Sequence, residues 1–410
     1  MNRRTRVSRT AWIWTCTASV SAIALGASSG ANAQETAEVE LRAGAVAATN
    51  PFLTAGEDPQ SVALSVEVLP TMTWNDEVST LTLNGRLRYE EWLDKYDSDL
   101  SGQVGLAVTR QASETLEIFG SASFESIERS SPDLLVSSIE DGENLPLIDP
   151  GLEPLDPTLS VGGVRRQSAV ATAGFRKQVS AVSQINATLS SAMNWFNEGG
   201  VDYRSSELSL GYQRAIAPNL TFLSEVRGTK SDYLDQARGD GTFGTALAGL
   251  SAQVSPTGVL TATAGIAIAS VDTGFGENQQ GEFFVMAADY CEELLQGRLC
   301  LGGSRESRPT TIGGASTLTA VDVGWNRAFD RGENISFNLR YSDAKASLAA
   351  FDTDNVQRTK FLGASAYYVY PISERLGVFA SPSAIKLFDD PSDRDANYQV
   401  MIGLSYVFGR

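Results

Sequence analysis

The stretch that decides the fold lies near the end of the chain and reads Tyr398-Gln399-Val400-Met401-Ile402-Gly403-Leu404-Ser405-Tyr406-Val407-Phe408. Apolar side chains occupy every second position from Tyr398 to Phe408, and mostly small or polar side chains fill the positions between them. Successive side chains of a β-strand point to opposite faces, so this spacing predicts a strand with one wholly apolar face.

The same alternation recurs in segments of ten to fifteen residues, most clearly at 81–89, 207–213 and 335–342. A soluble β-sandwich also alternates, so alternation alone does not identify a membrane protein. Three further features favour a membrane barrel: charged residues in mid-strand on the polar faces, aromatic residues near strand ends such as Trp74 and Trp92, and connections that are alternately short and long. The sequence therefore predicts an all-β fold, a single closed antiparallel transmembrane β-barrel with short periplasmic turns and long external loops.

Counting these segments predicts about sixteen strands, within a range of fourteen to eighteen, and a single domain over residues 34–410. The longest external connections are expected at 128–164 and 273–313. Beyond residue 33 no stretch of eighteen apolar residues occurs, so no transmembrane helix is predicted there.

The first 33 residues have the pattern of a cleaved signal peptide. Four arginines (Arg3, Arg4, Arg6 and Arg9) precede an apolar stretch over 12–27, which is too short to span a membrane. Ala31-Asn32-Ala33 has the small-x-small form of a cleavage site, so we expect the mature chain to begin at Gln34. The expected location is the outer membrane of a Gram-negative cell. There Phe408, two residues from the end, would serve as the aromatic signal for the barrel assembly machinery.

Charge and composition exclude several classes of function. The net charge is −17, and loss of the four leader arginines takes it to −21, which argues against nucleic acid as a partner. A surface this acidic would need divalent cations between it and lipopolysaccharide. The chain has no histidine, so Ser-His-Asp and Cys-His nucleophiles and imidazole metal ligands are excluded. We therefore expect no enzyme activity and no cofactor.

Two cysteines remain after processing, Cys291 and Cys300. A close pair in an oxidising compartment predicts a disulfide, here one that staples a mobile surface loop. A metal site would require further soft ligands nearby, and the sequence provides none.

Charged residues on the predicted polar faces are candidates for lining a pore. They are Arg42, Arg86, Arg88, Arg227, Arg340, Glu207 and Glu225. The external connection 128–164 is rich in acidic residues, and its candidates for a constriction are Asp133, Glu140, Asp141 and Glu143. If this connection folds inward, its carboxylates and the arginine wall set a transverse field across the pore. The alternative is a solvated external loop, with the lumenal charges satisfying one another.

Short motifs near the mature N-terminus carry a family resemblance. They are Ala43-Gly44, Thr49-Asn50-Pro51-Phe52-Leu53, Val68-Leu69-Pro70, Trp74, Tyr89 and Asp94-Lys95-Tyr96. Together they resemble the β-barrel porin 2 family, whose members are often associated with capsule or exopolysaccharide loci. The family usually has Tyr and paired Asp before the Asn of the first motif, whereas this chain has Val46-Ala47-Ala48-Thr49. The resemblance implies a role in polysaccharide handling or passive transport, and it supplies no functional residue.

Two functions remain open from the sequence. The first is a passive pore or export-associated channel without catalysis. The second is a plugged barrel that acts as a structural or docking scaffold for envelope polysaccharide machinery. Oligomeric state is not readable from the sequence.

Overall fold

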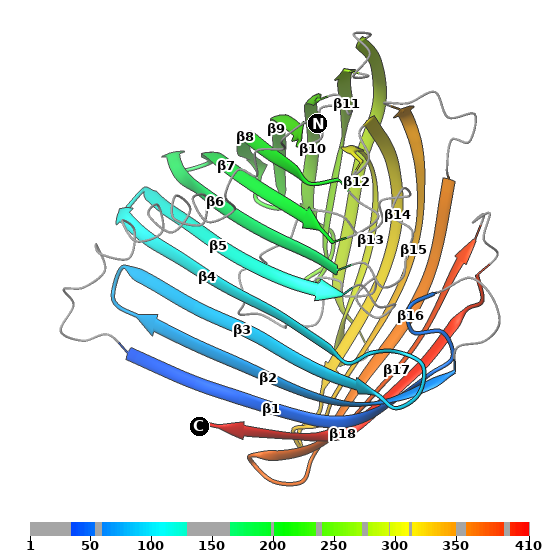
Figure 1. The fold of residues 1–410 in the computed structure, drawn as a ribbon. Helices are drawn as coiled ribbons and strands as arrows, with labels where there is room; N and C mark the ends of the chain where they lie inside the picture. The colour runs from blue at the N-terminus through cyan, green and yellow to red at the C-terminus, as the bar shows by residue number, and fades with distance from the viewer. Residues whose placement is uncertain are drawn as a thin grey trace, which may run out of the picture.

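The computed structural model describes residues 34–53, 60–128, 165–197, 201–234, 240–272, 278–294, 296–310, 314–349, 358–388 and 394–409. Eighteen strands make up one closed antiparallel sheet (Figure 1). They are β1 (Gln34–Ala48), β2 (Ser61–Asn75), β3 (Ser79–Trp92), β4 (Asp99–Ser113), β5 (Leu116–Glu128), β6 (Arg165–Ser180), β7 (Ser183–Phe196), β8 (Tyr203–Ala217), β9 (Leu220–Tyr233), β10 (Gly241–Gln253), β11 (Val259–Asp272), β12 (Asn278–Leu294), β13 (Gly297–Pro309), β14 (Gly314–Ala328), β15 (Asn334–Ala349), β16 (Arg358–Pro371), β17 (Leu376–Phe388) and β18 (Asn397–Phe408).

Each strand pairs with its neighbours in the sequence, and the first strand pairs with the last. β1 and β18 lie side by side in register from Val39↔Phe408 to Ala48↔Gln399, which closes the sheet into a barrel (Figure 1). No free sheet edge is left, because every strand has two partners. The expected closed antiparallel barrel is confirmed.

The two ends of the barrel differ in their connections. One end, here the turn end, holds Gln34, Phe408 and connections of two to five residues. The opposite end, here the loop end, holds connections of four to thirty-six residues. Within the ranges that the structure describes, no helix is long and apolar enough to cross a membrane.

The strand count is eighteen rather than sixteen. The two additional strands, β12 and β13, occupy most of the stretch 273–313 that the sequence predicted to be one loop. Apolar residues run consecutively over Phe283, Phe284 and Val285, so the alternation that marks other strands is lost. Phe284 is exposed on the outer face, whereas Val285 is buried on the inner face. Both faces of this part of β12 are therefore apolar.

The outer face of the barrel is apolar and exposed. On neighbouring strands Leu189 lies opposite Leu208, and Leu210 lies opposite Val226, and each of the four is half or more exposed. In β18 the predicted apolar face is the outer one, with Ile402 56% exposed, while Ser405 of the same strand is buried on the inner face. The alternation therefore separates an apolar exterior from a polar interior.

Candidate functional site

The charged side chains that the sequence predicted on the inner face of the barrel are paired. On β1 the Arg42 Nε atom lies 2.8 Å from Glu40 Oε1, and Arg42 Nη1 lies 3.6 Å from Glu67 Oε2 on β2. Arg86 on β3 donates to the same Glu67 carboxylate, which is only 4% exposed. Because Arg42 and Glu67 lie opposite each other in the register, a ladder of alternating charges crosses the three strands.

The other arginines with predicted inward positions also have acidic neighbours. Arg88 Nε lies 3.8 Å from Glu90 Oε1 and donates to Ser101 Oγ at 3.3 Å. Arg340 Nε lies 3.5 Å from Asp322 Oδ1 on the neighbouring strand β14. An arginine wall facing an acidic loop requires unneutralised arginines, whereas here each arginine lies within 4.0 Å of a carboxylate oxygen. The arrangement fits the alternative in which lumenal charges satisfy one another.

A second charged group lies on β8 and β9. Arg227 Nη2 lies 2.8 Å from Glu225 Oε1, and Arg227 Nε lies 3.5 Å from Glu207 Oε1. Thr229 Oγ1 donates to the other oxygen of Glu207 at 3.0 Å. The sequence placed Arg227, Glu207 and Glu225 on the inner face, and the structure brings these three together into one network.

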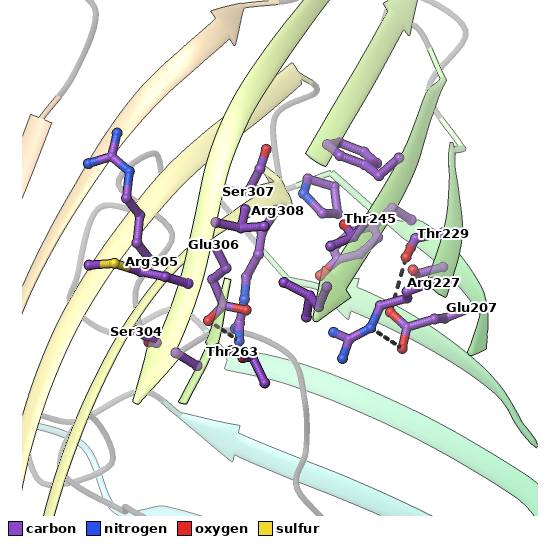
Figure 2. Close-up of a pocket in the computed structure, with 18 residues that line it drawn as sticks. Glu207, Arg227, Thr229, Thr245, Thr263, Ser304, Arg305, Glu306, Ser307 and Arg308 are labelled. Carbon is purple, nitrogen blue, oxygen red and sulfur yellow. Dashed lines mark hydrogen bonds and ion pairs between the residues drawn. The ribbon is translucent and has the colours of Figure 1, made fainter. Parts of the chain in front are cut away.

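This network borders a cavity of about 210 Å³ at the loop end of the lumen. Figure 2 shows Glu306 and Arg308 of β13 on the opposite side of the cavity from Glu207 and Arg227, with Arg308 Nη2 2.6 Å from Glu306 Oε1. The cavity is thus lined by two separate ion pairs together with hydroxyl side chains such as Thr245. Such a lining offers hydrogen-bond donors and acceptors to a polar solute.

The β13–β14 tip, defined as residues 306–310 and 314–318, lies inside the barrel. β12 and β13 stop pairing at Met286↔Arg305, although β12 continues along β11 and β13 continues along β14. Residues 314–318 are buried on both faces. Ala315 lies on the face of β14 that points outward nearer the turn end. At the tip this face packs against Val271 on the inner face of β11. The tip therefore forms a second layer behind the wall.

The tip reaches the wall at β9, which lies four strands from β13 in the sheet. The Tyr233 hydroxyl, at the end of β9, donates to the backbone oxygen of Thr310. Tyr233 is 7% exposed, and its ring lies 5.7 Å from that of Tyr203 on β8. A hydrogen bond between residues so far apart in the sequence holds the tip across this side of the lumen.

The first connection also folds inward at the loop end. Asn50 N donates to Asn397 Oδ1 at 2.9 Å, and Leu53, with a φ of 50°, turns the chain back. Phe52 packs between Trp92 and Tyr96, with ring centroids 5.8 and 4.7 Å away. Asn50, Phe52, Leu53 and Tyr96 belong to the motifs that resemble the porin 2 family, and here they cover the inner wall. An Asn-Pro-Phe-Leu run in an expected external loop was the signal for this burial.

The predicted disulfide, constriction residues and signal peptide can each be located in the chain. Cys291 and Cys300 form a disulfide, but it joins paired strands β12 and β13 at the turn end and not a mobile loop. The expected constriction residues Asp133, Glu140, Asp141 and Glu143 lie outside the described residues, as does the expected signal peptide. Among the described residues, no group of three or more acidic or cysteine side chains is arranged to hold a metal ion.

Comparison with known proteins gave similarity to solved structures alone. No protein-family model matches the chain, and no curated protein matches it. OccAB3 of Acinetobacter baumannii is 12% identical with a TM-score of 0.43, over 92% of this chain and 99% of that one. OccK2 (OpdF) of Pseudomonas aeruginosa in complex with glucuronate is 11% identical with a TM-score of 0.44, over 92% and 96%. A BenF-like porin from Pseudomonas fluorescens Pf-5 is 10% identical with a TM-score of 0.45, over 92% and 99%. Sequence identities and TM-scores this low do not allow a binding site or a solute to be inferred for this chain.

Proposed function

We propose that the chain is a non-enzymatic outer-membrane channel for small polar solutes. One observation carries this proposal: the closed wall is apolar on its outer face and charged on its inner face. Hydrocarbon cannot satisfy exposed backbone groups, and a closed sheet leaves none unpaired at an edge. A barrel of sixteen to eighteen strands is also wide enough to leave an aqueous channel.

The paired charges suggest how the wall treats a solute. Arg42, Arg86 and Arg227 each lie next to a glutamate, so a passing ion meets dipolar groups and not a wall of one sign. We therefore expect the described wall to select by size and hydrogen bonding more than by net charge. A solute in the lumen would make such contacts in the cavity that Arg227 and Arg308 line.

Single-channel recording in planar bilayers tests the channel. The purified full chain is expected to give discrete conductance steps with weak preference between potassium and chloride. The same planar bilayer without protein serves as the baseline. Absence of steps from protein that migrates as a folded, heat-modifiable barrel would overturn the channel proposal.

A plugged scaffold is the second candidate, and two observations favour it. Both the segment Asn50–Leu53 and the β13–β14 tip fold into the lumen at the loop end. If these elements close the mouth, the folded barrel will not conduct, and conduction will appear in variants that loosen them. An association with exopolysaccharide machinery is supported by the family resemblance alone, and co-purification with envelope proteins tests it.

A further inference from the structure

Basic side chains gather on the outer face of β13 to β17 at the loop end. They are Arg305, Lys345, Arg358, Lys360 and Lys386, and we call them the basic patch. The register places Arg305, Thr319, Asp343 and Lys360 in one row across four neighbouring strands. Lys345 and Arg358 lie opposite each other in the next row towards the loop end. Lys386 lies opposite Leu362, one row towards the turn end.

The side chains of the basic patch point outward. Phe361 is fully buried on the inner face, so its neighbour Lys360 faces the other way. Ile385 and Leu387 are buried inside on either side of Lys386. Arg305 lies opposite Met286, which is 46% exposed on the outer face, and Figure 2 shows Arg305 pointing away from Glu306 and Arg308.

The basic patch contrasts with the charge of the whole chain, which is −17. Among the outward positions of the described part of these strands at the loop end, Asp343 is the one acidic residue, and Arg358 donates to it through Nε at 2.8 Å. Elsewhere at the loop end outward cations are balanced more closely. On β8 and β9, for example, Arg204 lies opposite Asp232, and Lys230 Nζ lies 2.5 Å from the Asp232 carboxylate.

Apolar side chains lie directly below the basic patch, towards the turn end. Val321, Tyr341 and Leu362 form one row, and each is 36% exposed or more. A ligand that fits both surfaces has an anionic headgroup and acyl chains. Arg305 and Lys360 are three strands apart, which is roughly 14 Å at a strand spacing of about 4.8 Å. This span suits a headgroup with two separated anionic groups better than a single phosphate.

We propose that the basic patch binds the phosphorylated headgroup of an outer-leaflet glycolipid, the lipid A portion of lipopolysaccharide. The inference rests on the outer-membrane placement proposed above and not on conduction. Both described ends of the barrel lie at the turn end, which is the periplasmic side in such a protein, so the basic patch lies at the outer leaflet. Arginine and lysine are the usual partners of phosphate, and the acyl chains would lie on the apolar row. Direct binding here removes the need for a divalent cation at this part of the acidic surface.

Binding of bisphosphorylated lipid A to the purified full chain in detergent tests the proposal, with native mass spectrometry and titration as readouts. The test variant is Arg305→Gln with Lys360→Gln, and the matched two-charge control is Arg204→Gln with Lys230→Gln. We expect the test variant to bind lipid A at least about tenfold more weakly than the wild type, and the control to bind as the wild type does. Heat-modifiable migration shows that each variant is folded.

Two further probes separate the sources of the phosphate. Dephosphorylated lipid A is expected to bind at least about tenfold more weakly than the bisphosphorylated form, because the headgroup charge is lost. Inorganic phosphate alone is expected not to compete. Equal binding of the two lipids, equal loss in both variants, or full competition by inorganic phosphate would each overturn the proposal. Failure of conduction would leave this binding result unaffected, so the two proposals fail separately.

Discussion

The two neighbouring residues Leu189 and Ser190 on β7 test which face of the wall meets lipid. Leu189 is 57% exposed on the outer face, and Ser190 lies opposite Glu207 on the inner face. Leu189→Arg places a charge in hydrocarbon at a cost of about 2–4 kcal/mol, whereas Ser190→Arg places it in the lumen beside a carboxylate. We expect Leu189→Arg to reduce the free energy of unfolding in lipid vesicles and Ser190→Arg to leave it nearly unchanged. Similar losses at both positions would show that the assigned faces are wrong.

The orientation of single residues was predictable from the sequence, and their partners were not. The alternation around Ile402 placed apolar residues on one face, and the structure confirms this because period two is a property of any strand. The pairing of Arg42 with Glu67 depends on the register between β1 and β2, which a single sequence does not contain. The sequence therefore left both alternatives open, an arginine wall opposite an acidic loop and lumenal charges that satisfy one another.

At the scale of elements, β12 and β13 are consecutive antiparallel strands that a disulfide joins near the turn end. Cys291 lies directly opposite Cys300, nine positions further along the sequence. A loop this short gives about 2–3 kcal/mol in the chain-entropy model, and flanking β-pairs already restrict it. We expect Cys291→Ser with Cys300→Ser to lower the unfolding free energy by less than this value and to leave the barrel closed. Urea unfolding measures the change, and loss of heat-modifiable migration would contradict it.

The β13–β14 tip provides a second prediction at this scale. Tyr233→Phe removes the hydroxyl that donates to Thr310, which costs about 1 kcal/mol. We expect faster amide exchange over 306–310 and 314–318 and a larger or noisier conductance, because the tip loosens. Tyr398→Phe is the control, since Tyr398 is 63% exposed on the outer face. If exchange and conductance are the same in all three proteins, the hydrogen bond does not hold the tip.

The predicted loop ends at residue 313, which agrees with the start of β14 at Gly314, but the sequence did not predict that residues 314–318 lie in a second layer. A strand with one apolar and one polar face is expected to cover one face only, whereas both faces are covered where two layers stack inside a barrel. Thr317 and Leu318, at successive positions of β14, are both buried. Long-range packing of this kind follows from the closed shape and not from local pattern.

At the scale of the whole molecule, closure depends on the contact between the first and last strands. Gly44 on β1 lies opposite Gly403 on β18, and the ring of Phe379 on β17 lies over this contact. A Cβ atom built on Gly403 would lie 2.3 Å from the Ala43 backbone oxygen and 2.8 Å from the Phe379 ring. The two backbones therefore approach each other more closely than a side chain permits.

We expect Gly403→Ala to lower the free energy of unfolding by about 1–3 kcal/mol, the usual cost of overpacking, and to slow refolding into vesicles. The matched control is Gly228→Ala on β9, where an added Cβ meets no atom within 4 Å. Urea titration and the time course of heat-modifiable migration measure stability and closure separately. Because β1 and β18 are joined by pairing alone and not by a turn, crowding at this contact acts on barrel closure, whereas crowding within a hairpin acts on one connection. Equal stability and equal closure rates in the two variants would show that the Gly44–Gly403 contact does not limit closure.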